Sequence, residues 1–290
     1  MRFPATSANL GPGFDAVGLA MGLWLDVRAE VADSWEVTAT GRDAALCGAV
    51  EGNLILETYR KVAGAGAHKL RVFVENEIPL GMGCGSSAAA ILAGVSLANH
   101  FESMGWTGER VMREACLIEG HPDNVAACWL GGFVASCMDG SDVIATSCGR
   151  ESKWKLMVVV PGKGLATSKA RGMLPASYSK EDVVFSVQRV GLLVAAVEHG
   201  RGDMLRVAMQ DLIHQPYRAE ACPMLPKLLP LAGSDGILGV ALSGAGPSVL
   251  LVLDEAADLA AIEGLVRGLV EEEVEVLVTA IANGVEGFEV

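Results

Sequence analysis

Residues 78–91 read IPLGMGCGSSAAAI, a stretch in which three glycines and two serines precede a run of alanines. Glycines leave room for backbone N–H groups to converge on an anion, and a helix beginning near Ser86 or Ser87 would add its positive N-terminal end. A serine hydroxyl at a helix start can cap the helix or reach a phosphate-bound Mg²⁺. The stretch therefore predicts either an anion site or a structural turn.

Two common nucleotide-binding fingerprints do not fit this stretch. A Walker A loop requires a lysine before its serine or threonine, and no lysine occurs here. A Rossmann loop, G-x-G-x-x-G, requires a third glycine where the chain has Ser86. The missing fingerprint argues against an NAD-dependent oxidoreductase.

Composition narrows the class of protein. Of the 290 residues 51% are apolar, which suffices for a sizeable core, and the net charge of -13 has the wrong sign for a protein held to nucleic acid by phosphate neutralisation. No apolar run reaches the length of a membrane span, and the N-terminus has no apolar signal segment. Seven irregularly spaced cysteines indicate reduced thiols. We expect a cytoplasmic protein with neither a nucleic-acid nor a membrane partner.

Hydrophobic periodicity predicts a mixture of helices and strands. The tail from residue 236 reads as strand, loop, strand, helix and strand, which indicates an α+β protein. A boundary near residue 160 would divide the chain into segments 1–160 and 161–290. The other expected strands are 23–31, 69–78, 131–137 and 155–162, and the expected helices are 53–66, one from Ser87, 107–120 with Thr107 as N-cap, and a pair over 186–212 broken at Gly200–Gly202.

Three further patches rich in glycine or asparagine accompany the first. They are PATSANLGPGFDAVGLA (4–20), IEGHPDNVAACWLGGFVAS (118–136) and LSGAGPSVLLVL (242–253). In this order, and together with residues 78–91, they resemble the GHMP kinases, and TSANLGPGFD with EGHPDNVA and LSGAGPS resembles the homoserine kinase branch of that family. The resemblance covers nearly the whole chain. It implies a two-domain α+β fold, with an N-terminal domain like domain 2 of ribosomal protein S5 and a ferredoxin-like C-terminal domain, and a homodimer.

The resemblance also implies a reaction and its cofactors. ATP and Mg²⁺ would serve to phosphorylate the side-chain hydroxyl of L-homoserine, giving O-phospho-L-homoserine in threonine biosynthesis. Ser87 and Glu119 would be the Mg²⁺ ligands, and Asn53 matches an asparagine near adenine, although a helix N-cap explains Asn53 equally well. Cys84 stands where the family usually has leucine, and packing beneath the loop suits it. The expected ATP contacts are Pro79, Leu80, Gly81, Met82, Gly83, Cys84, Gly85, Ser86, Ser87, Ala88, Ala89 and Asn53.

A zwitterionic substrate requires groups of both charges. Guanidinium forks suit its carboxylate, and Arg171 and Arg218 fall at the family's carboxylate-binding positions, although either alone would more often be a surface charge. Outside the family context, His121 could be a hydrogen-bonded loop histidine and Asp15 a turn residue. The resemblance implies a homoserine pocket formed by Asn9, Asp15, His121, Asn124, Thr167, Arg171, Arg218 and Gly244.

The implied catalytic residues favour positioning over base catalysis. They are Ser87, Glu119, Asp123 and Asn124. Asp123 could act as a base, but Asn124 stands where mevalonate kinase-like members place a catalytic aspartate, so we expect no strong general base. Two alternatives stay open at this point: a GHMP kinase that acts on mevalonate or a sugar, and a non-catalytic nucleotide-binding or dimerisation module with the same fold.

Overall fold

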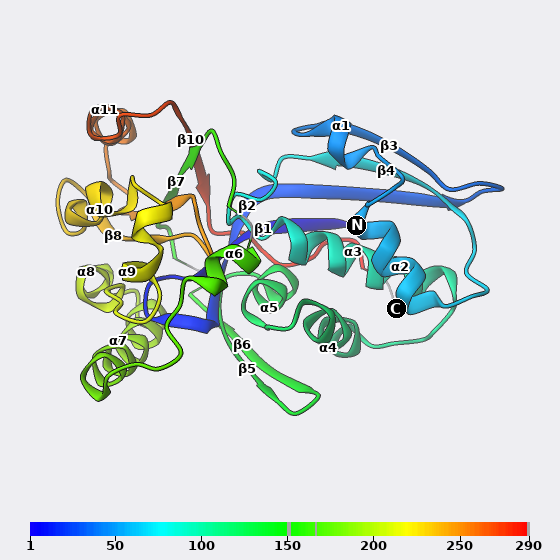
Figure 1. Cartoon of the computed structure of the whole chain (residues 1–290), viewed down its shortest axis with the longest axis horizontal. Helices are drawn as coiled ribbons and strands as arrows, with labels where there is room; N and C mark the ends of the chain where they lie inside the picture. Colours follow the sequence, from blue (N-terminus) through cyan, green and yellow to red (C-terminus); the bar gives the residue numbers. More distant parts are fainter. Residues whose placement is uncertain (150–151, 166, 289–290) are drawn as a thin grey trace.

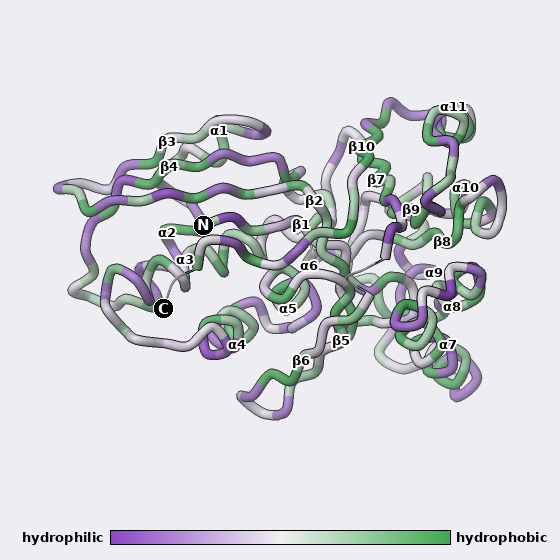
Figure 2. Tube along the Cα trace, turned by 180° about the vertical axis from the view of Figure 1, so that it is seen from behind, coloured by the Kyte–Doolittle hydropathy of each residue, from purple (hydrophilic) through white to green (hydrophobic). Residues whose placement is uncertain are grey.

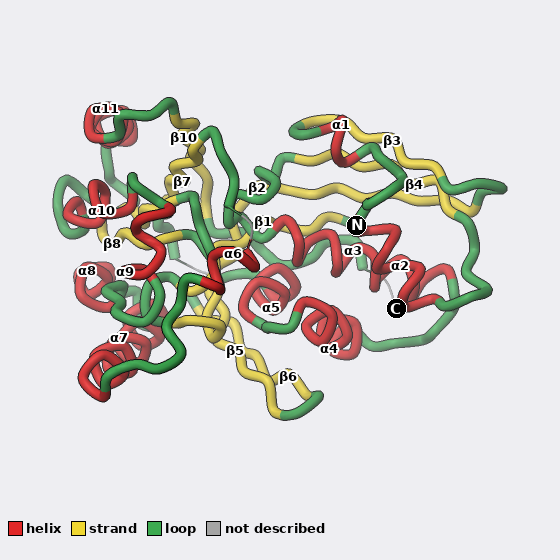
Figure 3. Tube along the Cα trace, in the orientation of Figure 1, coloured by secondary structure: helices red, strands yellow, loops and turns green. Residues whose placement is uncertain are grey.

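The computed structural model describes residues 1–149, 152–165 and 167–288, and two β-sheets dominate it (Figures 1 and 3). The first sheet has the order β3-β4-β2-β5-β6, with β1 paired to β2. Its pairs are antiparallel except for β3 and β4, which run parallel. Its strands are β1 (Arg2–Asn9), β2 (Gly13–Val31), β3 (Glu36–Gly41), β4 (Leu70–Asn76), β5 (Phe133–Asp139) and β6 (Asp142–Cys148).

Strand β2 organises this sheet because it pairs with three other strands. Burial alternates along β4, as expected for a strand with one face on the core. Figure 2 shows hydrophilic and hydrophobic residues interspersed along β2, β3 and β4. The N-terminal patch 4–20 is not one loop: it forms most of β1, a tight turn and the start of β2. The turn brings Asn9 and Asp15 to the edge of the sheet, each with positive φ.

Helices α2 to α5 cover one face of the first sheet (Figure 1). Asn53 caps α2 by accepting the N–H of Leu56, and Thr107 caps α4 as predicted. Helix α3 is buried on nearly all sides, as its alanine-rich sequence predicts. The helices of this half are α1 (Ala44–Cys47), α2 (Leu54–Ala63), α3 (Ser86–Phe101), α4 (Gly108–Glu119) and α5 (Asp123–Leu130).

The second sheet is antiparallel with the order β10-β7-β9-β8. Its elements follow one another as a strand, a helical segment of several helices, two strands, a helix and a strand, which is the ferredoxin-like arrangement expected for this half with additional helices after its first strand. The strands are β7 (Lys155–Pro161), β8 (Ile237–Leu242), β9 (Val249–Leu253) and β10 (Val274–Ala280). The helices are α6 (Thr167–Gly172), α7 (Lys180–Glu198), α8 (Leu205–Ala208), α9 (Gln215–Arg218), α10 (Leu225–Leu228) and α11 (Leu259–Leu269), with 3₁₀ turns at Gly202–Met204, Ala219–Ala221 and Leu229–Leu231.

Two sequence expectations need adjustment. The boundary at residue 160 falls inside β7, which pairs with β9 and β10 along its length, so the change of sheet lies between β6 and β7. The second of the two helices expected over 186–212 is reduced to a 3₁₀ turn and the four residues of α8. After β10 the chain returns to the first sheet, where Ile281 bridges to Met21 and Asn283 to Gly131. The two halves therefore share one hydrophobic core. The chain passes from the first sheet to the second after β6 and returns to the first sheet after β10.

Within the described residues, no helix combines the length and apolar character needed to cross a membrane.

Gly18 sets the distance between β2 and α5, and its substitution tests this packing. A Cβ at Gly18 would overlap the carbonyl oxygen of Asp123 and the Cβ of Ala127. We expect Gly18→Ala to lower the free energy of unfolding by about 1–3 kcal/mol, measured by urea denaturation. Gly191→Ala is the matched control, because Gly191 is exposed in α7 with no atom near its Cβ, and it should raise stability by up to about 1 kcal/mol. Equal effects of the two substitutions would contradict this account of the packing.

Candidate active site

A cavity of about 110 Å³ lies where the two halves of the chain meet. Its walls come from the turn after β1, the glycine loop before α3, the start of α5, helix α6 and the loop after β8. The structure brings most predicted site residues together here: Asn9, Asp15, Gly81, Gly83, Gly85, Ser86, Ser87, Glu119, His121, Asp123, Asn124, Arg171, Arg218 and Gly244.

The glycine loop is held by close backbone contacts rather than by its own turns alone. Gly81, Gly83 and Gly85 all have positive φ. A Cβ on Gly83 would overlap the carbonyl oxygen of Ser243, and one on Gly85 would overlap the hydroxyl of Thr6. Only Gly81 of the three has open space around it. The loop is therefore clamped between β1 and the loop after β8, and its open side faces the cavity.

Hydrogen bonds fix the same contacts. The N–H of Thr6 donates to the carbonyl oxygen of Cys84 at 3.0 Å. Ser243 Oγ lies 2.7 Å from the carbonyl oxygen of Gly83 and 2.9 Å from Ser7 Oγ. The Cys84 side chain is buried beneath the loop, and burial raises the pKa of its thiol to about 12. Cys84 thus packs beneath the loop, as predicted, and is not a reactive thiol.

Ser87 and Glu119 meet at one edge of the cavity. Ser87 lies in the first turn of α3, and its hydroxyl donates to Glu119 Oε2, at the end of α4, over 2.9 Å. Burial raises the pKa of Glu119, although the neighbouring His121 opposes the shift. A hydroxyl and a carboxylate side by side offer the oxygen ligands that Mg²⁺ prefers, and a cation would compensate a carboxylate that burial destabilises.

Asp123 anchors a compact polar network at the start of α5. Its Oδ1 accepts from His121 Nδ1 at 2.5 Å and from the N–H of Asn124 at 2.8 Å. Since a carboxylate only accepts, the proton of that first bond sits on Nδ1. Burial, the largest single effect, lowers the pKa of His121, but the bond to Asp123 and the negative charges of Asp123, Glu119 and Asp15 together outweigh it, and the net shift is upward. Asn124 Oδ1 in turn accepts from the hydroxyl of Thr6 at 2.8 Å.

Arg171 and Asp15 form a fork on the opposite wall. The Arg171 guanidinium donates to both carboxylate oxygens of Asp15, over 2.7 and 2.9 Å. The backbone N–H of Asp15 donates to Asn9 Oδ1, and Asn9 Nδ2 donates to the carbonyl oxygen of Gly244. The fork therefore ties α6 to the turn after β1 and to the loop after β8.

Arg218 is the largest fully buried side chain of the described chain, with 1% of its surface exposed. It donates to the carbonyl oxygens of Ala170 and Gly244, and its Nη1 lies 3.1 Å from His214 Nδ1. Burial, and then the nearby positive charge of Arg171, lowers the pKa of Arg218. No carboxylate among the described residues pairs with this guanidinium, so the cavity contains a buried cation without its anion.

Two supporting residues escaped the sequence analysis. Both guanidiniums lie near the ring of Phe14, whose centroid is 5.5 Å from Cζ of Arg171 and 5.4 Å from Cζ of Arg218. His214 is fully buried; its Nε2 donates to the carbonyl oxygen of Gly11, which leaves Nδ1 to accept from Arg218. Phe14 stood within the quoted patch 4–20, whereas no local pattern marked His214. Leu165 and Ala245 also line the cavity.

Some predicted site residues do not line the cavity. The Asn53 side chain caps α2 and donates to the carbonyl oxygen of Cys47, which matches the helix-cap alternative. Thr167 begins α6, but its side chain lies outside the described part of the chain. Asp15, His121 and Asp123 hold ligand atoms within 4.8 Å of one another, yet each is already engaged by a neighbour. The other predicted residues that do not line it are Pro79, Leu80, Met82, Cys84, Ala88 and Ala89.

Comparison with known proteins gives a consistent result. The family models described as GHMP kinases N terminal domain and GHMP kinases C terminal match residues 53–132 and 193–269. The chain is 46% identical to a homoserine kinase of Solibacter usitatus and 41% identical to one of Deinococcus radiodurans, each over 88% of this chain and 84% of the relative. A crystal structure of homoserine kinase from Cytophaga hutchinsonii superposes with a TM-score of 0.79 at 26% identity, covering 98% of this chain and 95% of that one. The chain therefore belongs to the GHMP kinase family, within its homoserine kinase branch.

Proposed function

We propose that this protein transfers the γ-phosphoryl group of ATP to the side-chain hydroxyl of L-homoserine, forming ADP and O-phospho-L-homoserine. The observation that carries the proposal is the buried, unpaired guanidinium of Arg218 beside the Arg171–Asp15 fork, in one cavity with the glycine loop. Kinship with homoserine kinases over most of the chain supports the same substrate.

The charges of the cavity suit a small zwitterion. Arg218 and Arg171 together receive the carboxylate of the amino acid, since a buried guanidinium without an anion is costly and a bidentate carboxylate satisfies it. The ammonium group is then met by the oxygens of Asp15 and Asn9. Mevalonate and sugars have no ammonium group, so this end of the cavity favours an amino acid over them.

The opposite end of the cavity suits the phosphates of ATP. Backbone N–H groups of the clamped loop Gly81–Gly85 and the N-terminus of α3 form the anion cradle. Ser87 and Glu119 would hold Mg²⁺, which when bound neutralises charge on the transferring phosphoryl group. Asn53 caps α2 and would affect adenine binding only indirectly, by fixing the position of that helix.

The residues around the hydroxyl favour catalysis by positioning. Asp123 is engaged by His121 and by the N–H of Asn124, and Asn124 by Thr6, so neither group is poised as a free base. In phosphoryl transfer the acceptor hydroxyl loses its proton late, so alignment and charge stabilisation can supply most of the acceleration. We assign His121 and Asn124 to orienting the substrate and Asp123 to holding both of them.

Several wider assignments belong to the same proposal. The enzyme would act in threonine biosynthesis, in the cytoplasm, and as a homodimer. Its two domains would correspond to the two sheets, with the division before β7.

The substrate assignment is tested by ADP release. L-Homoserine, mevalonate, galactose and L-threonine are offered in parallel at equal concentrations with MgATP in a coupled assay. We expect turnover on homoserine that exceeds turnover on each of the others. Turnover on mevalonate or galactose without turnover on homoserine would refute the proposal.

Loss of Arg171 or Arg218 should weaken the binding of homoserine and leave the binding of ATP unchanged. Arg171→Ala and Arg218→Ala are each expected to raise the KM for homoserine by about 10- to 100-fold, since a hydrogen bond to a charged group contributes about 1.5–3 kcal/mol. The KM for ATP should change little. Arg201→Ala is the control, because Arg201 is an exposed arginine paired with Asp203 outside the cavity. Equal effects on both KM values would contradict the assignment.

Two carboxylate-to-amide substitutions separate a base from a metal ligand. Asp123→Asn should retain measurable turnover, with a loss smaller than the roughly 10²- to 10⁴-fold that a general base contributes.

Glu119→Gln should instead raise the Mg²⁺ concentration needed for half-maximal rate. Protonation of Glu119 removes a Mg²⁺ ligand, and the raised pKa of Glu119 means that this protonation begins at a higher pH than for an ordinary carboxyl group. On acidification the Mg²⁺ affinity of the wild type should therefore fall at that higher pH. The Mg²⁺ affinity of Glu119→Gln should not change over the same pH range. Complete loss of kcat in a folded, homoserine-binding Asp123→Asn variant would establish Asp123 as the base.

A further inference from the structure

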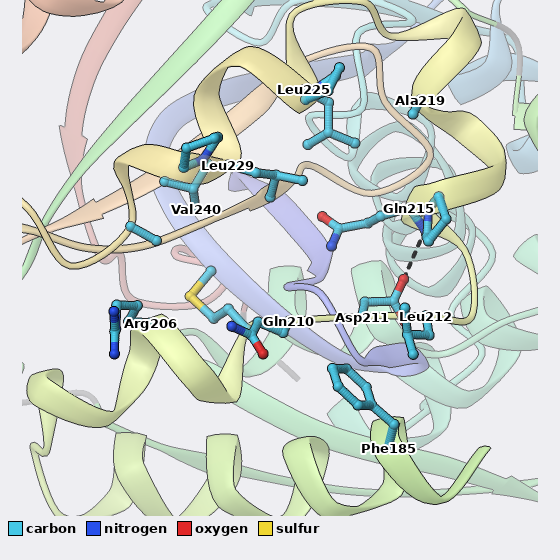
Figure 4. A pocket seen from close by; sticks show the side chains of 15 residues that line it. Phe185, Arg206, Gln210, Asp211, Leu212, Gln215, Ala219, Leu225, Leu229 and Val240 are labelled. Carbon is cyan, nitrogen blue, oxygen red and sulfur yellow. Dashed lines mark hydrogen bonds between the residues drawn. The ribbon is translucent and has the colours of Figure 1, made fainter. Parts of the chain in front are cut away.

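A second cavity, of about 500 Å³, lies on the other side of the segment that carries His214 and Arg218. It is enclosed by the end of α8, the chain that follows it, α9, α10 and the start of α7 (Figure 4). Phe185, Met209, Leu225, Leu229 and Val240 give it an apolar lining. No residue lines both this cavity and the proposed homoserine cavity.

One buried amide has an open donor in this cavity. The Gln215 side chain is part of a residue only 3% exposed, and its Oε1 accepts the N–H of Leu242 at 2.7 Å. That bond settles the orientation of the amide, so Nε2 is the atom turned toward the cavity (Figure 4). In the described parts of the chain Nε2 meets no acceptor, so this donor is open to the cavity.

A second amide, on the exposed Gln210, also has its oxygen engaged. Gln210 lines the same cavity, and its Oε1 accepts from both Nε and Nη2 of Arg189, at 3.3 and 3.2 Å. Its Nε2 is therefore the group left to bind an acceptor. The side-chain amides of Gln215 and Gln210 thus each have an N–H donor without an acceptor among the described residues, while their oxygens already accept hydrogen bonds from other residues.

The rim of the cavity is positively charged. The stem of the exposed Arg206 lies close to Gly233 at the rim of the cavity. Within residues 1–149, 152–165 and 167–288, neither Arg206 nor Arg189 has a carboxylate at salt-bridge distance. Two uncompensated guanidiniums beside one cavity stand out in a chain of net charge -13.

Asp211 also lines the cavity and brings one carboxylate to it. Its carboxylate is buried and accepts the backbone N–H groups of Ile213, His214 and Gln215, at 2.7 to 2.9 Å. These bonds engage both carboxylate oxygens. Among the described side chains at the cavity, the amide nitrogens of Gln210 and Gln215 and the guanidinium of Arg206 are the donors left without an acceptor.

We propose that this second cavity binds a small amphipathic carboxylate, a molecule with an apolar body and one carboxylate group. The body lies against Met209, Leu225 and Val240. The carboxylate accepts from Nε2 of Gln215 and of Gln210, and the charges of Arg206 and Arg189 compensate it. This site is separate from the proposed homoserine site and does not depend on the identity of the kinase substrate.

Octanoate is the probe, and octanamide, with the same body and no charge, is its matched neutral control. Titration calorimetry of the full-length protein should give one octanoate site, with affinity at least about tenfold above that of octanamide. Saturating homoserine should leave the octanoate affinity unchanged, because the two cavities share no lining residue. Equal affinity for octanoate and octanamide, no octanoate binding, or competition with homoserine would each overturn the proposal.

Substitutions locate the bound probe. Arg206→Gln should weaken octanoate about fivefold, the effect of one ion pair near the surface, and leave octanamide unchanged. Gln215→Glu keeps an acceptor for Leu242 and replaces the free donor by a charge, so it should abolish octanoate binding. Arg206 is exposed, so its variant keeps the test decisive even if Gln215→Glu does not fold. Arg201→Gln, a paired arginine outside the cavity, should bind octanoate like the wild type. Unchanged octanoate affinity in Arg206→Gln would refute the assignment.

Discussion

The close approach of the glycine loop to β1 and to the loop after β8 is the constraint on which the rest of the site depends. Gly83 and Gly85 have no room for a side chain, because Ser243 and Thr6 occupy it. Thr6 also holds Asn124, and the neighbouring Gly244 accepts from Asn9 and Arg218. One contact thus fixes the phosphate cradle, the start of α5 and the amino-acid end of the cavity relative to one another.

Electrostatics then shape what the cavity can accept. The small cavity is lined by two guanidiniums and a histidine of raised pKa, and also by the carboxylates of Asp15, Glu119 and Asp123. Arg171 is balanced by Asp15, but Arg218 is surrounded by carbonyl oxygens, an imidazole and an aromatic ring, none of which carries a full negative charge. The missing negative charge is what a substrate carboxylate supplies. A neutral His214 is essential to this arrangement, and burial, the largest effect, lowers its pKa to about 4.

Local sequence patterns predicted the regular elements where one face is buried. The alternating residues of β4, the alanine-rich α3 and the capped α4 appear as expected. Strands β1, β3 and β6 and helix α5 were not predicted. These sequences are short. The three strands are stabilised by their neighbours across the sheet more than by their own periodicity, whereas α5 is stabilised by packing against β1, β2 and β5. The boundary near residue 160 stays a prediction. Strand β7 follows β6 with no change in composition, and only strand pairing assigns β7 to the second sheet.

The sequence by itself determined the family, the glycine loop and most of the residues around the cavity, because these are contiguous motifs whose chemistry is readable residue by residue. Only the tertiary structure decided what those residues do for one another. Gly83 and Gly85 permit packing as much as anion binding, Asn53 caps a helix, and Arg218 depends on His214, four residues before it, and on Gly244, 26 residues after it. Contacts between residues distant in sequence depend on the path of the whole chain, and no local pattern encodes that path.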